Sequence, residues 1–322
     1  MTIVGFHASH EQLPPSRLLR AVAHAEAAGF DAAMCSDHFE PWSVRQGHSG
    51  YAWSWLGAAL EATSLPIGVV TAPGQRYHAA IAAQKIATLA EMYPGRFWAA
   101  LGSGEAINEH VTGDVWPAKE VRDARLTETV DVIRRLLDGE EVSVDGLVRV
   151  DRARVWSRPD TAPPLLAAAV SSETASEVAA WSDGLITVDQ PREALRDVIA
   201  SYRDAGGPGP IAVQVHLSWA DTDEEAAAIA HDQWRQSLVP PHLAWELDRP
   251  EDFDDRTADA TPEEVAGSLI ASADTGRHLA HLAGIAELGV DRIYLHHVGT
   301  RQDAFIDAFG EHVLPQLKES AR

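Results

Sequence analysis

The stretch Met34–Trp42, MCSDHFEPW, places several chemically reactive side chains directly after an apolar segment. Asp37 and His38 follow the apolar residues, and Trp42 stands four positions beyond His38. A histidine is the natural proton carrier near neutral pH, and a carboxylate tuned by burial can act with it. The segment GSGEAIN supplies such a carboxylate in Glu105. We therefore expect His38 and Glu105 to form an acid–base pair.

Each of these residues also has a plain structural interpretation. A single histidine after a strand can cap a loop, and Asp37 can accept backbone hydrogen bonds in a turn. Glu105 can be an exposed loop acid, although Gly104 before it favours a backbone that lies close to a ligand. The sequence leaves these alternatives open for each residue taken singly.

Eight short apolar segments alternate with longer segments of helical period along the chain. They are IVGF, AAMCS, PIGVV, FWAAL, PLLAAAV, GLITV, IAVQVHL and RIYLHH. The alternation predicts an α/β fold of the (β/α)8 barrel type, whose strands are buried on both faces and therefore almost continuously apolar. A doubly wound sheet would need a glycine-rich phosphate turn after the first strand, and GFHASHEQLPPS has none. We expect one domain, residues 1–322.

Two segments depart from this alternation and are interpreted as insertions. EEVSVDGLVRVDRARVW predicts a hairpin before the fifth strand, and residues 218–274, after the seventh strand, are too many for one loop and one helix. Loops at the C-terminal ends of barrel strands build the active site. Polar residues just after each apolar segment are therefore the candidate site residues.

The end of the fifth strand, AAAVSSETASEV, is a candidate phosphate site. Ser171, Ser172 and Thr174 would lie where a helix begins, so that backbone N–H groups, hydroxyls and the helix dipole could converge on a dianion. An ordinary serine N-cap explains the same pattern. No metal site is expected, because HExxH and paired C-x-x-C spacings are absent and the neighbouring His296 and His297 would point to opposite faces of a strand.

Composition narrows the classes of partner. Forty-eight acidic against 26 basic residues give a net charge of -22, which argues against nucleic-acid binding. No stretch is apolar enough for a membrane span, and the start lacks a basic region followed by an apolar one. With a single cysteine, Cys35, the chain fits a reducing compartment. A cytoplasmic protein acting on a small molecule is expected.

The motifs resemble those of the bacterial luciferase-like flavin oxidoreductases, near the branch of deazaflavin (F420)-dependent glucose-6-phosphate dehydrogenases. The resemblance rests on GFHASHEQ, SDHFEPW with QGHSG, APGQRYHAAIAAQ, YPGRFWAALGSGEAINE and TGDVWP, and it covers roughly the first 190 residues. It implies a (β/α)8 barrel enzyme, an oxidoreductase that holds a flavin or deazaflavin at its C-terminal mouth. Barrels of this kind commonly dimerise through helices beside the second to fourth strands, so a homodimer is expected.

The resemblance also implies residue roles, carried over position by position. They are His38 and Glu105 for catalysis, Trp42 for catalysis and the substrate, Glu11 for the substrate, and Asp37, Asn108, Val69 and Val70 for the cofactor. In that family the histidine acts as a base on the substrate hydroxyl, the glutamate donates a proton to the cofactor, and the aspartate contacts the cofactor ring. Val69 and Val70 match a bulge in the third strand that often contains a non-proline cis peptide, which survives where function requires it.

Two departures from the dehydrogenase branch bear on the substrate and the cofactor. Lysines that would hold a sugar phosphate are missing, since TVDQPRE has none and Gly267 and Ser268 stand where another belongs, so glucose 6-phosphate is not expected. Ser171 with Thr174 resembles the phosphate grip of FMN-binding members, and an acidic chain suits the acidic deazaflavin tail less well. We therefore expect FMN, with monooxygenase chemistry and a separate flavin reductase as options. The alternative is an F420-dependent dehydrogenase of an alcohol or sugar-like substrate.

Overall fold

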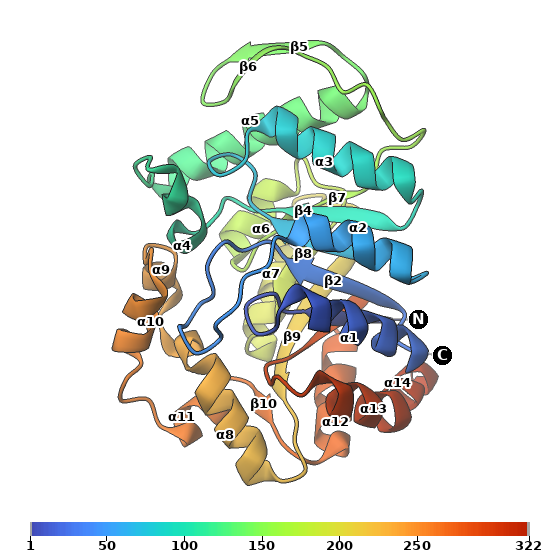
Figure 1. Ribbon diagram of the computed structural model, residues 1–322, viewed down its shortest axis with the longest axis vertical. Helices are drawn as coiled ribbons and strands as arrows, with labels where there is room; N and C mark the ends of the chain where they lie inside the picture. Colours follow the sequence, from blue (N-terminus) through green and yellow to red (C-terminus); the bar gives the residue numbers. More distant parts are fainter. Residues whose placement is uncertain (1, 321–322) are drawn as a thin grey trace.

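The computed structural model describes residues 2–320 and contains a closed barrel of eight parallel strands (Figure 1). The barrel strands are β1 (Ile3–Ala8), β2 (Ala32–Ser36), β3 (Ile67–Thr71), β4 (Phe97–Leu101), β7 (Leu165–Ala168), β8 (Leu185–Val188), β9 (Ile211–Ser218) and β11 (Arg292–His297). The barrel closes because β9 pairs with both β8 and β11. Each strand coincides with one of the eight apolar segments, so the predicted (β/α)8 fold is confirmed.

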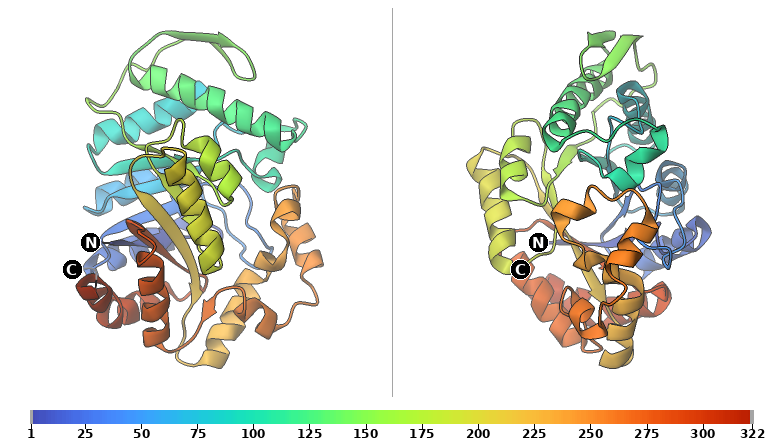
Figure 2. Two further views of the ribbon diagram at one scale, coloured as in Figure 1. Left: turned by 180° about the vertical axis from the view of Figure 1, so that it is seen from behind. Right: turned by 90° about the vertical axis from the view of Figure 1, so that its left-hand side faces the viewer.

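Helices surround the barrel on its outer side (Figures 1 and 2). The longer ones are α1 (Pro15–Ala27), α2 (Ala52–Ala62), α3 (Ala79–Met92), α5 (Lys119–Leu137), α6 (Ser172–Val178), α7 (Arg192–Asp204), α12 (Thr275–Ala286), α13 (Gln302–His312) and α14 (Leu314–Ser320). Their apolar faces and the outward-facing strand residues form one continuous core. Within residues 2–320, no helix has both the length and the apolar character needed to cross a membrane.

The inside of the barrel is filled below its mouth by large aromatic side chains. The rings of Trp98 and Tyr294 are buried and lie 5.7 Å apart between centroids. They occupy the space beside Gly68 and Gly5, where a Cβ would overlap the Trp98 and Tyr294 rings respectively. Glycine at these two strand positions therefore allows the rings to close the barrel interior from below.

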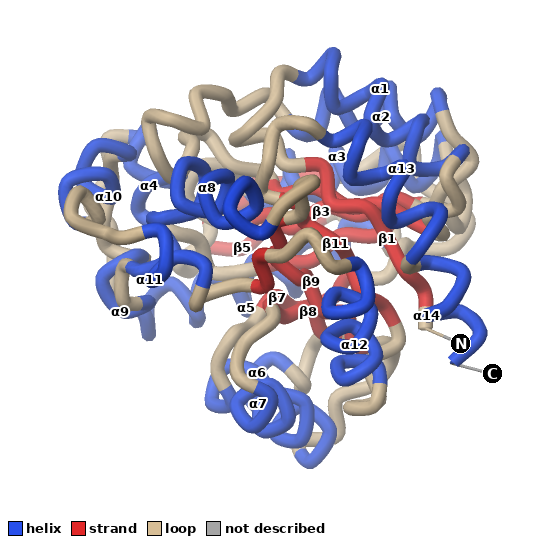
Figure 3. The backbone as a smooth tube through the Cα atoms, turned by 90° about the horizontal axis from the view of Figure 1, so that it is seen from below, coloured by secondary structure: helices blue, strands red, loops and turns tan. Residues whose placement is uncertain are grey.

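Both predicted insertions are present. The strands β5 (Val142–Asp145) and β6 (Arg149–Ala153) pair antiparallel as a hairpin that protrudes beyond α5 at the top of Figure 1. The segment after β9 contains α8 (Asp223–Trp234), the 3₁₀ helix η2 (Arg235–Leu238), α9 (Pro241–Ala244), α10 (Pro250–Arg256), α11 (Pro262–Ala266) and β10 (Ile270–Ala271). Figure 3 shows this group of short helices together at one side of the barrel.

The third strand differs from the expectation based on the family. β3 pairs in continuous register with β2 and β4, and every peptide bond among residues 2–320 is trans. The cis peptide expected near Val69 and Val70 is therefore not found. Unbroken pairing on both sides leaves this strand regular.

Candidate active site

Three side chains from separate loops meet at the C-terminal mouth of the barrel. Glu11 follows β1, His38 follows β2, and Glu105 follows β4. Nδ1 of His38 lies 2.6 Å from Oε1 of Glu11, and Nε2 of His38 lies 3.8 Å from Oε2 of Glu105. The side chain of Glu11 is 3% exposed, whereas those of His38 and Glu105 are 17% and 27% exposed. His38 is therefore held from below by Glu11 and presents Nε2 toward the mouth.

The electrostatics of this triad follow from burial and close charges. Burial alone would lower the pKa of His38, but the attraction and the hydrogen bond of Glu11 outweigh it and raise that pKa above 6.5. Burial alone would raise the pKa of Glu11, but His38 and a hydrogen bond from Ser9 lower it to about 2. Burial raises the pKa of Glu105 against the opposing effect of His38. Glu11 thus stays ionised, whereas His38 and Glu105 can exchange protons.

Asn108 ties Glu105 to the loop that carries His38. It lies in the short helix α4 (Ala106–Glu109), which is followed by the 3₁₀ helix η1 (His110–Thr112). Its Nδ2 donates to Oε2 of Glu105 at 3.0 Å, while its Oδ1 accepts from the backbone N–H of Phe39 at 2.7 Å and of Glu40 at 3.4 Å. The amide thus fixes the relative position of the two loops. Its predicted contact with a cofactor stays a prediction.

Asp37 is anchored inside the protein. Its carboxylate is fully buried and accepts hydrogen bonds from Trp53 Nε1 at 2.7 Å, Thr71 Oγ1 at 2.9 Å and the Tyr77 hydroxyl at 3.1 Å. Arg76 donates through Nη2 to the backbone carbonyl of Asp37 at 2.6 Å. The Asp37 carboxylate thus accepts three protein hydrogen bonds and holds the end of β2 in place. Its predicted contact with a cofactor ring stays a prediction.

Trp42 joins the catalytic loop to the insertion after β9. Its ring lies edge-to-face against His38, with centroids 5.3 Å apart, and against Phe253 of α10 at 5.4 Å. Nearby, Asp254 accepts hydrogen bonds from Ser43 Oγ at 2.7 Å and from the backbone N–H of Val44 at 3.0 Å. The insertion is thus docked on the β2 loop and forms one wall of the mouth.

The remaining cofactor candidates differ in position. Val70 faces the barrel interior, whereas Val69 packs in the outer core between barrel and helices, so its side chain does not face the mouth. Ser171 caps α6, since its Oγ accepts from the N–H of Thr174 at 3.3 Å and donates to Thr174 Oγ1 at 3.1 Å. Ser172 is the first residue of that helix. Phosphate binding at these three residues stays a prediction.

A layer of histidines from β1, β9 and β11 also lies at the mouth, and His216 among them was not selected from the sequence. His7 and His296 lie 4.4 Å apart between ring centroids, and His216 lies 5.2 Å from His296 and 4.5 Å from Trp234. Alternation along β9 and β11 would have indicated that these residues face inward. Within the described part of the chain, no three His, Cys, Asp or Glu side chains are arranged to hold a metal ion.

Burial and hydrogen bonds favour the neutral form of these histidines. The amide of Gln214 donates to Nδ1 of His296 at 3.3 Å, and Nε2 of His296 donates to Oε1 of Gln12 at 2.8 Å, so His296 carries one proton. Burial lowers the pKa of His7 to about 3 and that of His216 to about 4. Burial also lowers the pKa of His296 far below 6.5.

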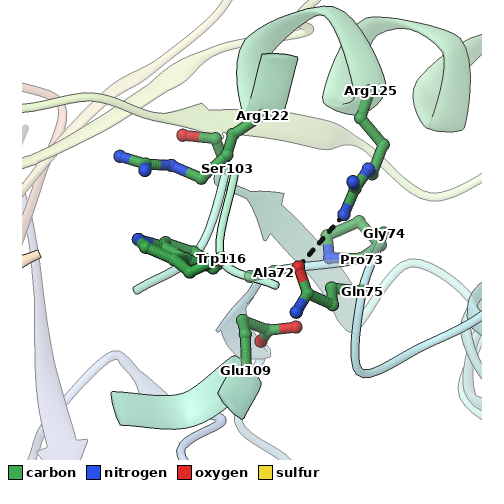
Figure 4. A pocket seen from close by; sticks show the side chains of 9 residues that line it. All are labelled: Ala72, Pro73, Gly74, Gln75, Ser103, Glu109, Trp116, Arg122 and Arg125. Carbon is green, nitrogen blue, oxygen red and sulfur yellow. Dashed lines mark hydrogen bonds between the residues drawn. The ribbon is translucent and has the colours of Figure 1, made fainter. Parts of the chain in front are cut away.

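A small hollow lies beside the loops that follow β3 and β4 (Figure 4). It is lined by residues of the β3 and β4 loops and of α5, among them Glu109 and Trp116. Arg125 crosses it and donates to Oε1 of Gln75 at 3.2 Å. The guanidinium of Arg122 lies 4.4 Å from the Trp116 ring centroid. The hollow is thus a polar extension of the site on the β3–β4 side.

The closed barrel with an acid–base triad at the C-terminal end of its strands defines an α/β-barrel enzyme. The model of the luciferase-like monooxygenase family matches residues 1–292. The chain therefore belongs to the luciferase-like family, as its motifs predicted, and it is an oxidoreductase.

Similar proteins narrow the position within the family. The chain is 33% identical to an F420-dependent glucose-6-phosphate dehydrogenase of Nakamurella multipartita, over 98% of this chain and 96% of that one. It is 32% identical to the enzyme of the same description from Beutenbergia cavernae, over 100% and 99%. Its structure matches an F420-dependent secondary alcohol dehydrogenase bound to an F420–acetone adduct, with a TM-score of 0.90, 30% identity and coverage of 98% and 99%. These relatives favour the deazaflavin alternative over the expected FMN.

Proposed function

We propose that the protein is an F420-dependent dehydrogenase that interconverts a small uncharged alcohol and its carbonyl compound. The observation that carries the proposal is the buried carboxylate of Glu11 at 2.6 Å from Nδ1 of His38, which leaves Nε2 free toward the mouth. A histidine oriented in this way can accept the proton of a substrate hydroxyl. The similarity to F420-dependent dehydrogenases along nearly the whole chain supports the choice of cofactor.

Two apolar side chains at the mouth support the placement of a planar ring cofactor there. Val70 at the end of β3 and Ala168 at the end of β7 are partly exposed apolar side chains that pack on the interior core. Glu105, partly exposed after β4, supplies a polar group beside them. Val70 and Ala168 would support the ring by apolar contact, and Glu105 would face its polar edge. When bound, the deazaflavin supplies the hydride acceptor.

On the protein side, four residues take part in the reaction. Nε2 of His38 takes the hydroxyl proton while the C–H hydride leaves the same alcohol, so that a neutral carbonyl product forms. Glu11, ionised because its pKa is about 2, stabilises the imidazolium. Glu105 holds a proton more readily than an exposed carboxylate, since burial raises its pKa. Trp42 packs on the His38 ring and limits its rotation.

An uncharged substrate is supported by the residues after β8. Asp189 occupies this end of the strand, and its Oδ2 accepts from Nε2 of His281 of α12 at 2.5 Å. The hydrogen bond with Asp189 raises the pKa of His281. Because His281 is already paired with Asp189, it is not a free cation that could bind a sugar phosphate. Neutral imidazoles and Trp234 line the neighbouring part of the mouth.

Titration of the purified full-length protein with coenzyme F420 and, separately, with FMN tests the cofactor. We expect F420 to bind more tightly. Reduction of F420 is then followed by its absorbance with propan-2-ol and with glucose 6-phosphate as substrates. We expect turnover with the alcohol and at least about tenfold lower kcat/KM with the sugar phosphate. Tighter binding of FMN, or oxygen consumption with reduced FMN, would overturn the proposal in favour of a flavin monooxygenase.

A further inference from the structure

Lys85 lies in an unusual environment for a lysine. It belongs to α3, and its Nζ lies 3.0 Å from the ring centroid of Tyr77, 4.3 Å from that of Trp53 and 5.9 Å from that of Tyr51. Lysines commonly extend their ammonium group to water along an apolar stem. Here Nζ is buried and has no hydrogen-bond partner among the described residues. The ammonium group is held by aromatic faces instead.

The rings around Lys85 are the same rings that anchor Asp37. Trp53 donates its indole N–H to Oδ2 of Asp37 at 2.7 Å, and Tyr77 donates its hydroxyl to Oδ1 at 3.1 Å. Arg76 also lies over the Tyr77 ring, 4.6 Å from its centroid. Because the Lys85 ammonium group attracts the faces of both the Trp53 and the Tyr77 ring, it orients the hydrogen bonds that these two side chains donate to Asp37. Asp37 in turn directly precedes His38.

Lys85 does not touch the triad, so its effect would be indirect. We propose that Lys85 is a positioning residue whose ammonium group holds Tyr77 and Trp53 against the carboxylate of Asp37, and so fixes the end of β2 that presents His38. The proposal rests on the proposed function only for the activity measurements below. The aromatic cage of Lys85, formed by Tyr77, Trp53 and Tyr51, does not depend on which cofactor binds.

The charges that face Lys85 make the cage sensitive to pH. Burial lowers the pKa of Lys85 to about 7; Asp37 and Glu109 oppose this shift, and Arg76 adds to it. The phenols of Tyr51 and Tyr77 stay neutral, since burial raises both of their pKa values. An amine lacks the charge that a ring face attracts. The aromatic cage therefore holds Lys85 less tightly as the pH rises through about 7.

The small number of lysines allows a direct test of the cage. The chain contains three, Lys85, Lys119 and Lys318, so protein labelled with 13C at lysine Cε gives three signals that Lys85→Met assigns. We expect the Lys85 signal to titrate near pH 7. We also expect the indole N–H of Trp53 to exchange with solvent at least about threefold faster in Lys85→Met than in the wild type, with the exposed Trp156 as reference. A Lys85 signal that titrates at its ordinary pH, or unchanged Trp53 exchange, overturns the proposal.

Activity separates positioning from mere packing. With F420 and propan-2-ol, we expect Lys85→Met to lower kcat about three- to tenfold with KM for the alcohol unchanged. Lys85→Arg keeps a permanent cation, so its kcat should match that of the wild type below pH 7 and should exceed it above pH 7, where Lys85 loses its charge. Lys119→Met, which removes a surface ion pair with Asp123, is the matched control and should match the wild type. Equal kcat and equal pH profiles in Lys85→Met and the wild type would overturn the proposal. If the wild type shows no turnover with F420 at all, the proposed function is overturned. The labelling experiment then still tests whether Lys85 holds Tyr77 and Trp53.

Discussion

The titratable groups are charged and paired on one side of the barrel mouth and neutral on the other. On the β1–β4 side, ions are paired at close range, with Glu11 against His38 and Arg76 between Asp37 and Glu109. On the β9–β11 side, His216 and His296 are kept neutral by burial and by amide hydrogen bonds.

This difference indicates a division of labour within one pocket. Proton transfer needs a group whose charge can change near neutral pH. His38, on the β1–β4 side with its paired ions, is such a group. The neutral side offers shape and aromatic surface without competing for the proton. Replacements on the paired side should therefore change rates and pH profiles, whereas those on the neutral side should change stability.

The largest expected effect follows removal of the base. His38→Ala should lower kcat for alcohol oxidation by about 10²- to 10⁴-fold, because it removes the group placed to accept the hydroxyl proton. Steady-state F420 reduction measures this, and fluorescence titration should show F420 affinity within about twofold of the wild type. His24→Ala, at a surface histidine paired with Asp307, is the control. Retained turnover in His38→Ala would remove His38 from the mechanism.

The next effect concerns the pH dependence. Oxidation needs neutral His38, so its rate should rise with pH through the pKa of His38, which lies above 6.5. Glu11→Gln removes the stronger attraction and leaves burial and the attraction of Glu105, so the pKa of His38 should fall and the rising limb should move to lower pH. The maximal rate should fall because the imidazolium is no longer stabilised. An unshifted limb in the pH profile of kcat/KM would contradict the pairing of Glu11 with His38.

The same pair makes a testable contribution to stability. The lowered pKa of Glu11 stabilises the fold above pH 4.5, and this contribution is lost as the pH falls toward about 2. The raised pKa of His38 stabilises the fold below pH 6.5, and this contribution is lost as the pH rises through the folded-state value. Urea unfolding should show that Glu11→Gln loses most stability between pH 4.5 and 6.5. An equal loss at all pH values would point to packing alone.

A smaller effect is expected from the Asp37 anchor. Asp37→Asn keeps the shape but sets an amide NH₂ among the donors Trp53, Thr71 and Tyr77, so one of these hydrogen bonds should be lost. We expect a loss of about 1–3 kcal/mol in the free energy of unfolding. Urea denaturation followed by tryptophan fluorescence measures it. Asp307→Asn, at an exposed carboxylate, is the control, and equal stability of the two variants would refute the anchor.

The smallest effect should come from the neutral side. His216→Phe keeps an aromatic ring against Trp234, and His216 is neutral at pH 7 because burial lowers its pKa to about 4. The pH profile of kcat/KM should therefore be unchanged. As the pH falls from 6.5 to 4, the wild type loses stability because His216 takes up a proton in the unfolded chain but not in the fold. The variant lacks this group and should keep part of that stability. A shifted pH profile would show that proton chemistry reaches this side.

The sequence predicted the strands well because burial on both faces leaves an apolar signature at each of the eight. It also selected His38 and Glu105, since both directly follow strands whose ends must converge. It could not show that Asp37 is enclosed, because Trp53 and Tyr77 come from other parts of the chain. The pattern at Ser171 and Thr174 favoured FMN, whereas the relatives favour the deazaflavin. An ordinary helix cap, which these two residues form, has the same sequence pattern as a phosphate site, so the pattern alone could not decide the cofactor.

The aromatic plug of Trp98 and Tyr294 has a kinetic consequence. Because it closes the barrel from below, the mouth is the one way into the barrel interior through the part of the chain that the structure describes. A ring cofactor lying on Val70 and Ala168 would sit deeper than a small alcohol above it. The two would then bind in a compulsory order, cofactor first, and the carbonyl product would leave before the reduced cofactor.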